Sequence, residues 1–343
     1  MAASLSLYKP AHEWWGHRGW SELVFQGLWA LLLAVIIVIF MIGVAVVVIW
    51  YERKIAGDIQ SRIGPARVGG RFGVLQTLAD GLKLFFKEDI IPNACERWLF
   101  VIAPFFIFVP AVMAWVAIPF SPSWIAYDLD IGVFYIVAIS SLPQLGLIMA
   151  GWSSNNKYAL LGGMRAVAQL ISYEIPLVLA VLVVAMYANS LSMVTIVEKQ
   201  ASGWFILHPT LFIAFIIFFI CALAETNKVP FDLPEAESEL VSGYHVEYSG
   251  MRFAFFFLSE YASLFFLCAM ATTLFLGGWR GPLLPPVVWF LGKTGVLVTL
   301  VIWIRWTVPR LRIDQITRFG WKFLLPLALL DLIVAAFLAV GMS

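Results

Sequence analysis

Carboxylates gather in one short segment of this chain, between two long apolar stretches. The segment from Ala224 to Gly250 carries six acidic side chains and a single basic one among Lys and Arg, Lys228. The six acids are Glu225, Asp232, Glu235, Glu237, Glu239 and Glu247. Carboxylates this close together repel one another and titrate as a coupled group, so they can pass protons and respond jointly to one added charge. The spacing therefore indicates proton handling.

Four more charged side chains lie inside apolar stretches. Glu174 and Glu260 are ~15 Å and ~14 Å from the ends of theirs, at 1.5 Å per helical residue. Asp331 and Lys293 lie within two others. A charge at the centre of a membrane helix costs about 2.5–3.5 kcal/mol, so these groups must face protein or water and be paired or protonated. Two interpretations of these four groups stay open: a proton relay, and static ion pairs and hydrogen bonds that lock helix packing.

A second charged cluster follows the first apolar stretch. In YERKIAGDIQSRIGPARVGGRFG, seven charged residues fall within twenty positions, and the pairs Gly64-Pro65 and Gly69-Gly70 interrupt any helix. A basic loop at a membrane surface is one interpretation. A fixed polar surface that docks a partner or the head of a ligand is the other, because acids are interleaved with four separate arginines.

The residue sets of several other function classes are missing from the sequence. The three cysteines are far apart and form no CxxC pair, which argues against an Fe–S cluster or a disulfide framework. The four histidines give no membrane pair for haem, and there is no Gly-rich phosphate loop. A net charge of +1 gives no indication of nucleic acid. We therefore predict that the chain holds no redox cofactor, so any redox centres belong to other subunits.

The elements that must position these groups are membrane helices. Hydrophobic residues make up 62% of the chain and charged residues 13%, against about 25% charged in soluble domains. Roughly 20 apolar residues span a bilayer as a helix. Eight stretches qualify: Leu28–Trp50, Trp98–Ile118, Ile131–Trp152, Ala166–Tyr187, Trp204–Ala224, Phe253–Trp279, Pro286–Ile304 and Phe323–Met342. We predict an all-α polytopic membrane domain over residues 28–343, preceded by an extension over residues 1–27.

Basic residues set the expected orientation. Of the 22 Lys and Arg, 17 lie in the links after the first, third, fifth and seventh spans. Loops rich in Lys and Arg stay on the cytoplasmic side. This places the acidic segment in the cytoplasm and both termini in the periplasm. Pro143 and Pro176, inside two of the spans, each free a backbone carbonyl and can open room for water.

The first cytoplasmic link contains a short amphipathic helix, over GVLQTLADGLKLFFKED. Leu75, Leu78, Leu82 and Phe85 share one helical face, and Gln76, Asp80, Lys83 and Lys87 share the other. The segment is too short and too charged to span the bilayer, so we expect an interfacial helix. It is either a plain surface anchor or one wall of a site that opens at that surface.

Four motifs carry a family resemblance: ERKIAGDIQSRIGPARVG from Glu52, LADGLKLFFKED from Leu78, GWSSNNKYALLGGMRAVAQLISYE from Gly151, and AETNKVPFDLPEAESELVSGYHVEYSGMRFAFFFLSEY from Ala224. From about Val38 onward, the chain resembles the H-type membrane subunits of proton-translocating NADH–quinone oxidoreductases, respiratory complex I. The resemblance implies a translocase component in the bacterial cell inner membrane. Flavin and Fe–S clusters would then sit in peripheral-arm partners at the cytoplasmic face, and other membrane-arm subunits would flank the chain in the bilayer.

The resemblance also implies roles for particular residues. In this family quinone enters a tunnel walled by the first span, the interfacial helix and the sixth span, and Arg53, Gln60, Arg62 and Asp80 match cavity-lining positions. Glu174, Glu225, Glu235, Glu237, Glu239 and Glu260 match a chain of acids that couples quinone reduction to proton translocation. Two other classes stay open: the membrane anchor of a related hydrogenase, and a stand-alone cation transporter, although no inverted repeat is visible.

Overall fold

The computed structural model describes residues 22–201, 203–234 and 237–342, and its regular elements there are all helices. Seven helical stretches are long and apolar enough to cross a membrane, and α9 (Pro209–Glu225) is a shorter apolar helix. At 1.5 Å per residue, α9 is about 25 Å long, close to the thickness of a bilayer core. The predicted class, an all-α polytopic membrane protein, is confirmed.

Each of the eight predicted spans overlaps one helical stretch. These stretches are α2 (Glu22–Ile59), α4 (Arg97–Ala114), α5 (Gly132–Ser140) with α6 (Leu142–Ser153), α7 (Lys157–Ala188), α9, α11 (Gly250–Phe275), α12 (Pro286–Thr307), and α13 (Ile313–Phe319) with η4 (Gly320–Leu324) and α14 (Leu325–Met342). Shorter elements are α3 (Gln76–Phe86), α8 (Met193–Lys199), α10 (Glu237–Leu240), η1 (Trp115–Ala117), η2 (Phe205–Leu207) and η3 (Gly243–His245). Residues 1–21 of the expected N-terminal extension lie outside the described residues.

The third predicted span is divided in two by a proline. The α5 helix ends at Ser140 and α6 begins at Leu142, with Pro143 in its first turn. Proline has no backbone N–H and cannot continue the hydrogen-bond ladder of the preceding turn. Pro176, by contrast, lies within the continuous helix α7. The freed carbonyl of Ser172 faces η4, where a Cβ on Gly320 would lie 3.2 Å from it.

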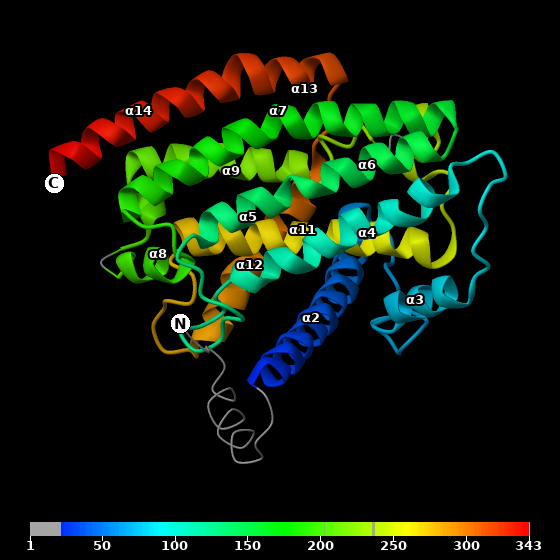
Figure 1. Cartoon of the computed structure of the whole chain (residues 1–343), viewed down its shortest axis with the longest axis horizontal. Coiled ribbons are helices and arrows are strands. Elements are labelled where there is room, and N and C mark those ends of the chain that lie inside the picture. Colours follow the sequence, from blue (N-terminus) through cyan, green and yellow to red (C-terminus); the bar gives the residue numbers. More distant parts are fainter. Residues whose placement is uncertain (1–21, 202, 235–236, 343) are drawn as a thin grey trace.

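Figure 1 shows α14, α7, α6 with α5, and α4 in successive rows, with α9 beside α7 and α11 beside α4. The α2 and α12 helices pack on the far side of α11, and α3 lies at the end of the bundle near α2 and α11. Backbones approach closely where glycine allows it. A Cβ on Gly162 of α7 would lie 2.7 Å from Cα of Gly243 in η3. The acidic loop that follows α9 is thereby seated directly on α7.

Lys293 of α12 is buried, and its ammonium group donates hydrogen bonds to three backbone carbonyls. The acceptors are Leu276 at 2.6 Å, Gly278 at 3.1 Å and Arg280 at 2.7 Å. These carbonyls belong to the link that follows α11, which ends at Phe275. Of the two interpretations open for this intramembrane charge, the contacts favour a static bond that locks α11 to α12.

Candidate functional site

Charged residues in the last turns of α2 and in the loop after it line an open concavity of about 880 Å³. Arg53, Arg62 and Gln76 contribute polar side chains to its wall, together with residues 63–67. Arg53 lies in the last turns of α2 and Gln76 begins α3, so the wall joins two helices through the intervening loop. The loop folds back because Gly73 has φ of 62°, and a Cβ there would lie 2.4 Å from the carbonyl of Pro65.

Two bonded pairs connect the four residues expected around a quinone. Arg53 donates to Oδ2 of Asp80 at 2.5 Å, across the gap between α2 and α3. Arg62 donates through Nε to Oε1 of Gln60 at 2.6 Å. Arg53 and Arg62 both line the concavity, so each predicted residue either faces it or is bonded to one that does. The structure brings together all four predicted positions.

The apolar side chains of α3 point away from the helix bundle. Leu78, Leu82 and Phe85 are exposed, whereas Thr77 is buried. This distribution is expected of a helix whose apolar face lies in the membrane interface and whose other face packs on protein. The predicted amphipathic helix is therefore present as α3, and its first residue, Gln76, borders the concavity. Its interfacial position stays a prediction.

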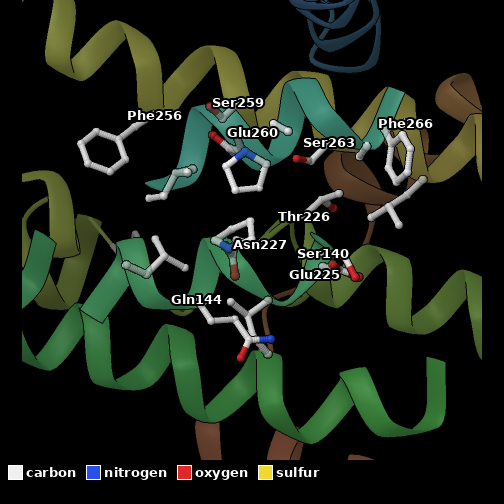
Figure 2. A pocket seen from close by; sticks show the side chains of 18 of the residues that line it. Ser140, Gln144, Glu225, Thr226, Asn227, Phe256, Ser259, Glu260, Ser263 and Phe266 are labelled. Carbon is white, nitrogen blue, oxygen red and sulfur yellow. The ribbon is translucent and has the colours of Figure 1, made fainter. Parts of the chain in front are cut away.

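A second, internal cavity of about 80 Å³ lies between α4, α5, α6, α9 and α11 (Figure 2). Its volume gives room for a few water molecules, and its polar lining offers them partners. Glu260 and Ser263 of α11 face Gln144 of α6 and Glu225 of α9 across it. Ser140, Thr226, Asn227 and Ser259 complete the polar lining. Pro143 also borders this space, so the break between α5 and α6 forms part of its wall.

Glu174 does not line the cavity but is hydrogen-bonded to a residue that does. Gln144 lines the cavity and donates from Nε2 to Oε2 of Glu174 at 2.7 Å. Three of the acids predicted inside or near the membrane, Glu174, Glu225 and Glu260, are thus gathered around one polar space. Gln169 of α7 ties the same region together by donating to the carbonyl of Ala224 at 2.7 Å.

Glu260 is also paired with a lysine whose importance sequence reasoning missed. Lys228, 1% exposed, forms an ion pair with Oε1 of Glu260 and lies 4.3 Å from the centre of the Tyr261 ring. Burial acts to lower the pKa of Lys228, but the carboxylate of Glu260 and neighbouring groups outweigh it and raise the pKa to about 12. The only signal in the sequence was the isolation of this lysine among six acids.

A second ion pair lies between the buried Glu52 of α2 and the partly buried Arg305 of α12. Arg305 also donates to the hydroxyl of Tyr261 at 3.3 Å. Tyr261 packs under the ammonium group of Lys228, so the two ion pairs form one continuous network. Glu52 is adjacent in sequence to Arg53 of the concavity, and Glu260 lines the internal cavity. The network therefore reaches from the internal cavity to the residue of α2 that precedes Arg53 in sequence.

The acids of the loop after α9 have different surroundings. Burial raises the pKa of Asp232 to about 6, and its Oδ1 has no hydrogen-bond partner among the described residues. Glu239 is bonded to two arginines. Glu235 lies outside the described residues, and the side chain of Glu237 is not described. The predicted clustering of Glu235, Glu237 and Glu239 stays a prediction.

No metal-binding constellation of three or more His, Cys, Asp or Glu occurs within residues 22–201, 203–234 and 237–342. Cys95, Cys221 and Cys268 are free thiols. The prediction that this chain has no redox cofactor of its own is not tested by these observations.

The sequence profile of the NADH dehydrogenase family matches residues 31–336 of the chain. The H subunit of NADH-quinone oxidoreductase from Geobacillus thermodenitrificans is 52% identical over 323 residues, which cover 93% of this chain and 95% of that protein. Its counterpart from Dehalococcoides mccartyi is 50% identical over 311 residues, with coverage of 90% and 87%. The counterpart from Bacillus mycoides is 51% identical over 308 residues, with coverage of 89% and 92%.

Proposed function

The chain belongs to the NADH dehydrogenase family, and we propose that it is the subunit of a proton-pumping NADH–quinone oxidoreductase that couples quinone reduction to proton translocation. One observation carries this proposal. A run of two ion pairs, Glu52–Arg305 and Lys228–Glu260, meets at Tyr261 and extends from the α2 residue next to Arg53 of the concavity to the internal cavity lined by Glu260. Such a run can transmit a change of charge between two sites because neighbouring ionisable groups titrate together.

The surface concavity is the proposed place for the quinone head group. Its carbonyl oxygens accept hydrogen bonds, and the guanidinium groups of Arg53 and Arg62 are permanent donors. The α3 helix begins at Gln76 in the wall of this space, and its exposed apolar face would give the isoprenoid tail a route from the bilayer. The concavity is open, so subunits of the peripheral arm would complete the site. Those partners would also hold the flavin and Fe–S clusters that deliver electrons.

The internal cavity is the proposed place for proton transfer. Glu225 and Glu260 line it, and Glu174 is bonded to its wall through Gln144. Water in this polar space would let protons move between carboxylates that do not touch. Negative charge on a reduced quinone would act first on Arg53, then on the neighbouring Glu52–Arg305 pair, and finally on Lys228 and Glu260. Glu235 and Glu237 would receive protons at the cytoplasmic entrance.

The orientation follows from the distribution of Lys and Arg. We place the acidic loop, α3 and the concavity on the cytoplasmic side of a bacterial inner membrane, with both termini in the periplasm. The cytoplasmic face would then dock the peripheral arm, and exposed apolar side chains of the outer helices would meet lipid or other membrane-arm subunits.

Photo-crosslinking tests the position of the quinone. A quinone carrying a photoreactive group on its head is added to the assembled enzyme in membranes, illuminated, and the labelled peptides are mapped. We expect labelling within residues 53–80, and we expect excess unmodified quinone to suppress it. Labelling confined to the outer surface of α14, unaffected by competing quinone, would contradict the proposed site.

A further inference from the structure

Glu239 occupies an environment unlike that of a proton carrier. Its Oε2 accepts a hydrogen bond from Arg165 at 2.6 Å, and its Oε1 accepts one from Arg310 at 2.7 Å. Arg165 comes from α7, whereas Arg310 comes from the link between α12 and α13. One carboxylate therefore joins its own loop to two segments that are 74 and 71 residues away from it in sequence.

Both oxygens of Glu239 are occupied by cationic donors. A proton on either oxygen would meet an N–H group of an arginine and would break a charge-assisted hydrogen bond. The bond from Arg165 accordingly lowers the pKa of Glu239 below its ordinary value, and the charges of both arginines act in the same direction. The ionised form is favoured at neutral pH, which is unsuited to accepting and releasing protons in turnover.

A second contact joins the loop after α9 to the α12–α13 link. The backbone N–H of Leu311, next to Arg310 in sequence, donates to the carbonyl of Pro230 at 3.2 Å. Further along the loop, Glu247 accepts from Asn156 at 2.7 Å, at the start of α7. The loop between α9 and α11 is thus attached to α7 and to the α12–α13 link at several separate points.

We propose that Glu239 is a positioning residue that clamps the acidic loop onto α7 and onto the α12–α13 link, and that it carries no proton in the transport path. Only the proton-uptake readout of this inference rests on the proposed function, because the clamp itself follows from the contacts of Glu239. Glu239 is 50% exposed, so solvent screens the two ion pairs, and each contributes modestly to the free energy that holds the loop in place. The clamp fixes the loop acids beside the helices that bear Glu174 and Glu225.

Hydrogen exchange in the assembled enzyme tests the clamp independently of quinone activity. Glu239→Gln is compared with the double variant Arg165→Gln/Arg310→Gln and with the triple variant that combines them. Glu88→Gln and Arg318→Gln are matched controls, because both residues are exposed and neither forms an ion pair within the described part of the chain. Amide exchange is followed over residues 237–248, together with proton uptake per NADH oxidised in vesicles.

We expect exchange over this loop to be roughly 2- to 5-fold faster for each ion pair lost, from the range measured for exposed pairs. The triple variant should be no faster than Glu239→Gln alone, because both remove the same clamp. Protons moved per NADH oxidised should stay at the wild-type value even where turnover falls. Unchanged loop exchange in Glu239→Gln would overturn the proposal. So would a lower proton ratio in Glu239→Gln that the arginine double variant does not share.

Discussion

Replacing Lys228 by methionine is expected to destabilise the protein strongly, by about 3–5 kcal/mol. Lys228 is 1% exposed and its partner Glu260 is 8% exposed, so bulk water does not reach either charge to solvate it when the other is removed. Methionine keeps the unbranched side chain but removes the charge. The carboxylate of Glu260 then either stays ionised without its ammonium partner or takes up a proton, and both outcomes cost free energy.

The same reasoning predicts that a second substitution restores most of the loss. In Lys228→Met/Glu260→Gln neither buried charge remains, and replacing both partners of a buried pair by groups of similar volume is often close to neutral. The contact of Lys228 with the Tyr261 ring is lost in both variants, which leaves a smaller deficit of about 1–2 kcal/mol.

The assay is thermal inactivation of the assembled enzyme in membranes. The activity followed is NADH oxidation by quinone, and the retained amount of this chain is measured separately. The single variant should lose assembled protein at a lower temperature than the wild type, and the double variant should lie between them, nearer the wild type. Equal stability of the wild type and the single variant would refute the reasoning. A double variant as unstable as the single would show that the charge of Glu260 is not the cause.

Four further substitutions have defined outcomes. Arg62→Lys and Asp80→Asn should lower quinone-linked turnover and leave NADH oxidation by water-soluble acceptors intact, because lysine cannot reproduce the donor fork of arginine; a parallel loss of both activities would indicate a structural role. Burial raises the pKa of Asp232 from 3.8 to about 6, so its ionisation costs stability as pH rises through that window, and the full cost is present above it. Asp232→Asn should therefore gain thermal stability over the wild type at pH 8 but not at pH 4, and equal gains at the two pH values would exclude this cause. Lys293→Met should loosen the α11–α12 turn, because three carbonyls lose one donor, and cleavage by protease near Arg280 should become faster than in the wild type.

The helices were predictable from the sequence because each depends mainly on local composition. Every predicted span overlaps a helix, and the amphipathic pattern correctly placed α3. The helix bounds differ from the predicted spans only locally. Pro143, noted inside the third span, lies in the first turn of a separate helix, and the last helical stretch begins at Ile313, ten residues before the predicted span. In the last case apolar composition was a poor guide, because α13 contains Asp314 and Arg318 and yet continues through η4 into α14.

The candidate site was less predictable because its contacts join distant segments. Arg53 and Asp80 are close in sequence and were grouped by motif, but the partners Glu52 and Arg305 are 253 residues apart. Lys228 and Glu260 were noted separately, and only the packing of the loop against α11 makes them a pair. Glu239 was grouped with its neighbours by spacing, whereas its bonded partners come from other elements. Charge counts along a sequence do not indicate which opposite charges meet.

The most direct test of proton coupling through the internal cavity is proton uptake in reconstituted vesicles containing variants of Glu174. Glu174→Gln keeps the size of the side chain and can still meet Gln144, but it has no site for a proton. Glu174→Asp keeps the carboxylate on a shorter side chain. In fully assembled enzyme, we predict that Glu174→Gln loses most proton uptake and quinone-linked turnover, while Glu174→Asp retains a substantial part of both. A Glu174→Gln enzyme that pumps protons at the wild-type rate would contradict the proposed coupling and leave Glu174 as a packing residue.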